Sequence, residues 1–269
     1  SFAQERLFVT AELHPDANVN ICVLLTPRRR RSAEDVRRAL RRLVQRHASL
    51  RTSFDVQSGH LEQVIHGDAS LEACVQQTDA VLSVDDVQQL ATVVSSQRID
   101  ARLAPLFRLV IVGRDCSQLI VCMHHLISDG WSMGVFAREL LALGEHPAVS
   151  LPPLPVQYTD FASWQRGALA HGELAEQLTY WRDVFIDATL VADLPTDFAP
   201  ARSRGTSRAL AVATIPTGVI DECARFNSSE RATVAMTLLA TLGLLIARIS
   251  GSDDVVVLTA HAARSRTEL

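Results

Sequence analysis

The chain of 269 residues contains no lysine, so that arginine supplies every basic side chain apart from histidine. The net charge is -4. A protein of this charge lacks the broad positive field that nucleic-acid binding requires, and we expect no nucleic-acid partner. The excess of arginine and alanine over lysine indicates a GC-rich genome.

Cysteine is also scarce, and its spacing excludes two kinds of site. The five cysteines stand at positions 22, 74, 116, 122 and 223, with no CxxC pair and an odd total. This pattern favours neither a zinc cage nor a disulfide framework. The first residues, SFAQERLFVTAEL, lack the basic start and long apolar core of a signal peptide. We therefore expect a reduced, cytoplasmic setting.

Long apolar runs are missing as well. The most apolar stretch, residues 234–249, is too short and too interrupted by Thr and Gly for a convincing membrane span, and we expect no membrane partner. With 48% hydrophobic and 21% charged residues, the composition is that of a soluble globular protein. Its length suffices for one large core or for two lobes.

The most informative stretch is residues 119–131, LIVCMHHLISDGW. Its first residues are apolar on both faces, which predicts a buried strand. The strand ends at His124 and His125, and Asp129 and Gly130 follow. Since successive strand side chains point to opposite faces, we expect one imidazole to face a cavity and the other to be held by the scaffold.

Three interpretations of this stretch remain open from its residues alone. The first interpretation is a catalytic histidine, which can exchange protons near neutral pH or hold a nucleophile by a hydrogen bond. Two structural histidines in a core strand are the second interpretation, and a metal site with His and Asp ligands is the third. Asp129 could pair with a cation and fix the loop, next to a glycine that permits a tight turn.

Other stretches favour the first interpretation. Four motifs stand in order along the chain: SFAQERL at the start, RHASLRTSF at 46–54, HHLISDG at 124–130 and YTDFASW at 158–164. Together they resemble the SxAQxRL, RHExLRTxF, HHxxxDG and YxDYAxW motifs of the condensation domains of non-ribosomal peptide synthetases. The sequence departs from those motifs at Ala48 and Phe161, and from the usual GTPVAGR-like run at Leu258, Ala260 and His261.

This resemblance implies an α/β fold of the chloramphenicol-acetyltransferase type, with two lobes in a V and a tunnel between them. We expect the N-terminal lobe at residues 1–172, a helix and linker at 173–205, and part of the C-terminal lobe at 206–269. Because the later FVNT-like motif is absent, the resemblance implies a domain truncated in its C-terminal lobe.

The resemblance also implies an activity. In this family the phosphopantetheine arms of an upstream and a downstream peptidyl carrier protein enter the tunnel from opposite faces. The amine of the acceptor attacks the donor thioester and forms an amide. We therefore expect carrier proteins and a neighbouring adenylation domain as partners, with no metal and no tightly bound cofactor.

Site roles follow from the same resemblance. His125 is the expected catalytic residue, next to His124, while Asp129 is structural and Gly130 keeps the acceptor passage open. Arg51 is the expected partner of Asp129, because a buried carboxylate needs a cation and a guanidinium offers bidentate geometry; Arg46 is the second candidate. The residues expected to line the substrate tunnel are Ser128, Trp131 and Ser132.

Three other activities compete with condensation. An epimerisation domain shares HHxxxDG, although the continuation DGWSM resembles condensation sequences. A free-standing acyltransferase acting on CoA would lack the companion motifs. A non-catalytic module that docks carrier or tailoring proteins is the rival from a different class.

The periodicity predicts further elements. A helix should follow an N-cap at Ser32 and turn its arginines outward. Residues 104–112 and the strand before His124 should form an antiparallel pair, with a helix after Gly130. The second half should contain helices at 174–185, 219–226 and 234–249, an extended linker at 193–205, and strands at 209–215 and 253–259.

Overall fold

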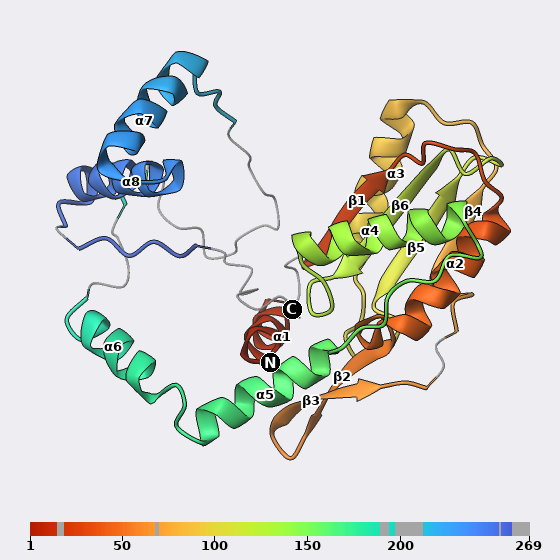
Figure 1. The fold of residues 1–269 in the computed structure, drawn as a ribbon, viewed down its shortest axis with the longest axis horizontal. Helices are drawn as coiled ribbons and strands as arrows, with labels where there is room; N and C mark the ends of the chain where they lie inside the picture. Colours follow the sequence, from red (N-terminus) through yellow and green to blue (C-terminus); the bar gives the residue numbers. More distant parts are fainter. Residues whose placement is uncertain (15–18, 68–69, 189–193, 197–211, 253, 260–269) are drawn as a thin grey trace. The chain divides into compact units, whose positions relative to one another are not determined.

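The computed structural model describes residues 1–14, 19–67, 70–188, 194–196, 212–252 and 254–259 (Figure 1). These residues fall into two compact units, one up to His171 and one from Gly172 onward. The division into lobes at 1–172, 173–205 and 206–269 stays a prediction.

A four-stranded sheet forms the centre of the first unit (Figure 1). β6 lies between β1 and β5 and is antiparallel to both, whereas β4 is parallel to β5. Every residue from Leu119 to His124 is buried, as the apolar pattern predicts, and the expected antiparallel pair is confirmed. The strands are β1 Asn20–Leu25, β4 Val75–Thr78, β5 Phe107–Val112 and β6 Gln118–His124.

Three helices cover the two faces of this sheet (Figure 1). α2 (Ala33–Arg46) and α4 (Gly130–Glu145) pack together on one face, and α3 (Val84–Ser96) covers the other. The predicted N-cap at Ser32 is confirmed, because its side chain accepts a hydrogen bond from the Asp35 amide. The buried face of α2 consists of Val36, Ala39, Leu40, Leu43 and Val44, which leaves the arginines outward.

The remaining elements of the first unit lie beside the sheet. α1 (Phe2–Leu13) and α5 (Tyr158–Ala170) are joined by two hydrogen bonds, Ser1 Oγ to Tyr158 Oη at 2.9 Å and the Phe2 amide to Gln165 Oε1 at 3.1 Å. The chain continues from α2 through the short 3-10 helix η1 (Ala48–Arg51) into the hairpin of β2 (Thr52–Gln57) and β3 (His60–Ile65), and η1 contacts α2, α5 and β3.

The described part of the second unit contains helices: α6 Ala175–Phe185, α7 Thr217–Glu230 and α8 Val234–Ser250. All three were predicted from the periodicity. The two predicted strands are wrong where they can be seen, since 212–215 and 254–259 are irregular; 209–211 and Asp253 lie outside the described residues. A strand needs a neighbouring backbone for its hydrogen bonds, and the described residues here supply helices only.

Two further predictions concern this half of the chain. The linker expected at 193–205 lies outside the described residues except for 194–196, which are irregular, and so do Ala260 and His261. Among described residues, no single helix has the length and apolar content needed to cross a membrane. α7 and α8 meet that criterion only as a pair bent by 103°.

Candidate active site

His124, the last residue of β6, organises the loop that follows it. Its side chain is 3% exposed, and Nδ1 accepts a hydrogen bond of 3.0 Å from the Leu126 amide. Its carbonyl accepts two more, from the Ile127 amide at 3.1 Å and from Ser128 Oγ at 3.3 Å. The loop after the strand is therefore held to one residue by three hydrogen bonds.

The ionisation of His124 fits this role. Burial, together with smaller electrostatic contributions from the neighbouring His125 and Arg98, lowers the pKa of His124 to about 4. The ring is therefore neutral at pH 7, and because Nδ1 accepts a hydrogen bond, the proton resides on Nε2. A histidine in this state supports the scaffold and does not exchange protons near neutral pH.

His125 has the opposite environment, because its side chain is exposed. Its amide donates a hydrogen bond of 2.9 Å to the Val19 carbonyl, which extends the pairing of β1 and β6 by one residue. Successive strand positions point to opposite faces, so its ring leaves the face on which His124 is buried. The backbone of His125 is thus fixed while its imidazole is accessible.

Asp129 begins α4. Its Oδ1 accepts hydrogen bonds from the Ser132 amide at 2.7 Å and from Ser132 Oγ at 2.6 Å, and it is the N-cap of the helix. A carboxylate at this position also interacts favourably with the positive end of the helix dipole. Asp129 and Ser132 therefore fix the point at which the histidine loop enters α4.

The predicted ion pair of Arg51 with Asp129 stays a prediction. Arg51 Nη1 donates a hydrogen bond of 2.7 Å to the His66 carbonyl. Arg51 lies at the end of η1, where the chain enters the hairpin and the His66 carbonyl is within reach. The second candidate, Arg46, instead has Nε 3.3 Å from Glu139 Oε2. Motif order alone did not reveal which acceptor each guanidinium meets.

Of the other residues expected at the site, two are bound within the loop and two are accessible to solvent. Ser128 is buried against His124, and Ser132 is part of the cap, so both act within the loop. Trp131 is 63% exposed. A Cβ atom built on Gly130 would meet no heavy atom within 4 Å. Trp131 and Gly130, the first two residues of α4, are therefore both accessible at the protein surface.

Gln4 contacts this loop as well, although the sequence marked it only as part of a motif. Its side chain is 4% exposed, and Nε2 donates to the Leu126 carbonyl at 2.9 Å. A glutamine on the inward face of a helix is the signal that could have identified it, since buried amides need partners. The first helix of the chain thus reaches the residue next to His125.

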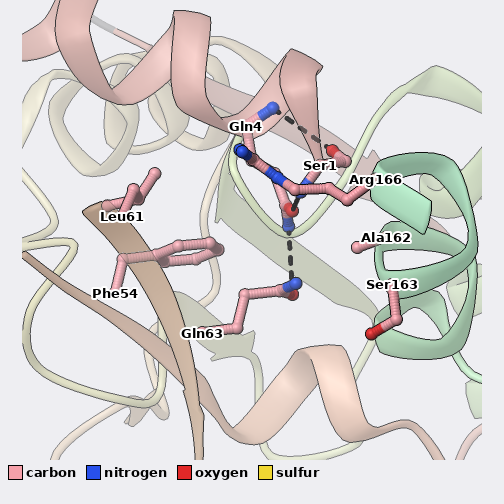
Figure 2. Close-up of a pocket in the computed structure, with 8 residues that line it drawn as sticks. All are labelled: Ser1, Gln4, Phe54, Leu61, Gln63, Ala162, Ser163 and Arg166. Atoms are coloured by element: carbon pink, nitrogen blue, oxygen red, sulfur yellow. Dashed lines mark hydrogen bonds between the residues drawn. The ribbon is translucent and has the colours of Figure 1, made fainter. Parts of the chain in front are cut away.

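Gln4 also lines a cavity of about 270 Å³ between α1, the hairpin and α5 (Figure 2). The hairpin contributes one wall and α5 the other, with the Gln4 carboxamide between Ser1 and Gln63. The lining residues are Ser1, Gln4, Phe54, Leu61, Gln63, Ala162, Ser163 and Arg166. Within the described ranges, no three His, Cys, Asp or Glu side chains converge as metal ligands would.

Comparisons with known proteins agree with the motif pattern. Gramicidin S synthase 2 of Brevibacillus brevis is 34% identical over 276 residues, and phosphinothricin tripeptide synthetase PhsC of Streptomyces viridochromogenes is 37% identical over 286 residues. Both alignments include all of this chain, which spans only 6% and 26% of the two relatives.

A solved structure, the complex of the X-domain and OxyB from teicoplanin biosynthesis, matches with 25% identity and a TM-score of 0.79. That match covers 93% of this chain and 57% of the other. The family model for the condensation domain matches residues 1–269. The resemblance in the four motifs is therefore confirmed, and the chain belongs to the condensation-domain family.

Proposed function

We propose that this chain carries the catalytic histidine of a peptide-synthetase condensation domain. The reaction is amide formation, in which the amine of a carrier-bound aminoacyl group attacks the thioester of an upstream acyl or peptidyl group. The observation that carries the proposal is the contrast between the two adjacent histidines. His124 is buried and neutral, whereas His125 presents an exposed ring from a fixed backbone.

His125 would act on the attacking amine. An α-amino group has a pKa of about 8, so part of it is unprotonated near neutral pH and needs little help from a base. The imidazole would orient the amine by a hydrogen bond and take up its proton as the new C–N bond forms. The thiolate of the donor arm then leaves, and the proton on His125 can pass to it.

The start of α4 would assist the same step. Asp129 fixes the loop at the helix N-terminus, where the partial positive charge of the helix favours negative charge nearby. An oxyanion that develops on the thioester carbonyl would gain from this field. Open space at Gly130 would admit a phosphopantetheine arm, and Trp131 would flank that passage.

The partners follow from this reaction. We propose an upstream and a downstream peptidyl carrier protein, each presenting its substrate on a phosphopantetheine arm, with an adjacent adenylation domain that loads the acceptor. No residue of the proposed step requires a metal. The setting would be the cytoplasm, in accord with five cysteines that are all unpaired.

A second candidate is a docking module without catalysis. The likeness to an X-domain that was solved in complex with OxyB supports it, because that domain forms a complex with another protein. Under this alternative the chain would bind carrier or tailoring proteins, and the exposed ring of His125 would have no chemical task.

The deciding experiment uses donor and acceptor carrier proteins loaded with simple aminoacyl groups, and intact-protein mass spectrometry to follow the transfer. Condensation predicts that the donor loses its acyl group while the acceptor gains it as an amide. Carrier binding without transfer would support the docking module and refute catalysis by this chain.

A further inference from the structure

We propose that Gln4 is a positioning residue for His125. It acts by holding the carbonyl of Leu126, the residue that follows His125 in the chain. This inference rests on the proposed function, because positioning matters only if His125 takes part in a reaction. No motif argument assigned Gln4 a task, and its assignment comes from the contacts in Figure 2 and in the adjoining loop.

Both backbone polar groups of Leu126 are bound by side chains. Its amide donates to His124 Nδ1 at 3.0 Å, and its carbonyl accepts from Gln4 Nε2 at 2.9 Å. The Leu126 side chain is 2% exposed and anchors the same residue in the core. The peptide groups on both sides of Leu126 are therefore each fixed by a buried hydrogen bond, and neither can rotate without breaking it. Because the first of them joins His125 to Leu126, the backbone direction of His125 is fixed as well.

Further hydrogen bonds hold Gln4 and the first turn of α1 in position. Its amide donates to Ser1 Oγ at 3.4 Å as part of the helix cap, and its Nε2 lies 3.4 Å from Gln63 Oε1 on the hairpin. The Phe2 amide binds Gln165 on α5 and so holds the first turn of α1 in place. Of these contacts, only the bond of Gln4 to Leu126 reaches the histidine loop. That bond is also the shorter of the two made by Nε2.

Two substitutions at Gln4 separate positioning from packing. Gln4→Met keeps the length and volume but removes the donor, and we expect kcat to fall about tenfold or more with the KM for the acceptor carrier unchanged. Gln4→Glu places a carboxylate against the Leu126 carbonyl, which should lower kcat at neutral pH. At lower pH the protonated carboxyl can donate to that carbonyl, so kcat relative to wild type should recover.

The matched control is Thr10→Val on the same helix. It removes an exposed hydrogen bond of 2.8 Å from Thr10 Oγ1 to the Arg6 carbonyl, which does not reach the histidine loop, and kcat should stay within about twofold of wild type. Wild-type transfer together with full activity of Gln4→Met would overturn the positioning role while leaving the proposed function intact. Absence of transfer by the wild type would instead defeat the proposed function. If Gln4→Met does not fold, a flat pH series for Gln4→Glu overturns the positioning role.

A second, independent inference concerns Cys22 and Cys122. These residues lie directly opposite each other in β1 and β6. The hydrogen bond from the His125 amide to the Val19 carbonyl shows that Val19 and His125, further along the same two segments of the chain, are a hydrogen-bonded pair. Along antiparallel strands, hydrogen-bonded pairs alternate with non-hydrogen-bonded pairs. Cys22 and Cys122 therefore form a non-hydrogen-bonded pair, whose Cα atoms typically lie about 4.5 Å apart.

Both thiols also point to the same face of the sheet. Cys22 Sγ donates to the Ala91 carbonyl and Cys122 Sγ to the Val94 carbonyl, each at 3.8 Å, one turn apart on α3. The expected Cα separation falls in the range of about 4.4–6.8 Å that disulfides require. We infer that this pair is a modification site at which a peroxide forms a reversible cross-strand disulfide.

The chemistry balances with one peroxide. Cys22, the more accessible thiol, attacks hydrogen peroxide and becomes a sulfenic acid with release of water; Cys122 then attacks that sulfur, and a second water leaves. The pKa of Cys22 is lowered by the Cys122 thiol beside it, which favours Cys22 as the first nucleophile. Two thiols are oxidised, and the peroxide is reduced to two waters.

Peptide mapping under non-reducing conditions tests this inference. After treatment of the full chain with hydrogen peroxide, the peptides that contain Cys22 and Cys122 should be linked, and dithiothreitol should separate them. Cys122→Ser should abolish the link, whereas Cys116→Ser should leave it. A sulfinic or sulfonic acid at Cys22 without any link to Cys122 would overturn the inference.

Discussion

The two units of this protein both contain helices that the sequence predicts, but the units differ in how those helices are packed (Figure 1). α2 of the first unit buries five residues against the sheet and α4. α8 of the second unit is more apolar, yet none of its residues is buried in the described structure. Periodicity therefore specifies a helix, while burial depends on a partner surface. The proposed catalytic loop lies in the unit that provides such a surface.

The largest expected effect contrasts the leucines of these two helices. Leu43 is fully buried, whereas Leu239 is 40% exposed. Leu43→Ala should lower the free energy of unfolding of the first unit by about 2–5 kcal/mol, because it removes buried area and leaves a cavity. Leu239→Ala should cost about 0.5 kcal/mol or less. Urea unfolding of both variants measures the difference, and equal costs would show that α8 is covered after all.

Measuring stability as a function of pH tests the burial of His124 in the first unit. The pKa of His124 is about 4 in the folded state against 6.5 in the unfolded chain, so the unfolded state binds the proton first. The contribution of neutral His124 to stability is therefore complete above pH 6.5 and is lost as the pH falls towards 4. Over this range the free energy of unfolding should fall by about 3 kcal/mol. His124→Asn keeps an acceptor for the Leu126 amide without titrating, and it should flatten this part of the stability curve. A curve unchanged by the substitution would contradict the assignment.

Helix caps allow a smaller comparison between the units. Asp129 caps α4 and Thr233 caps α8, each through a bond to the amide three residues later. Asp129→Ala should cost about 1–2 kcal/mol of unfolding free energy, whereas Asp129→Asn, which retains the cap, should cost less. Thr233→Ala should have an effect confined to α8, seen as faster amide exchange in its first turn. Global destabilisation by Thr233→Ala would show that the second unit is as cooperative as the first.

The smallest effect tests which group is the main partner of Arg51. If its main contact is the His66 carbonyl, Arg51→Ala should cost about 1–2 kcal/mol. Arg41→Ala is the matched control on the exposed face of α2 and should change stability by about 0.5 kcal/mol or less. A loss of about 3–5 kcal/mol in thermal or urea unfolding of Arg51→Ala would instead indicate that it neutralises a buried carboxylate.

Much of the first unit could be predicted because local signals and burial agree there. The cap at Ser32, the apolar strand before His124 and the helix after Gly130 each follow from neighbouring residues. The long-range contacts could not be derived in this way. Spacing along the chain does not reveal that Gln4 reaches Leu126, or that Arg51 meets His66. The predicted strand at 253–259 failed for a related reason, since its pattern is local but its pairing is not.

The roles of the two histidines can be separated by one measurement. Single-turnover amide formation would be followed for wild type and for His125→Ala, with loaded carrier proteins and with the unfolding midpoint recorded for both. We predict a loss of about 10²–10⁴-fold in rate for His125→Ala, as expected for the removal of a positioned acid–base group. The unfolding midpoint should stay unchanged because this ring is exposed. Transfer at the wild-type rate by His125→Ala would contradict the central claim that the exposed histidine performs the chemistry.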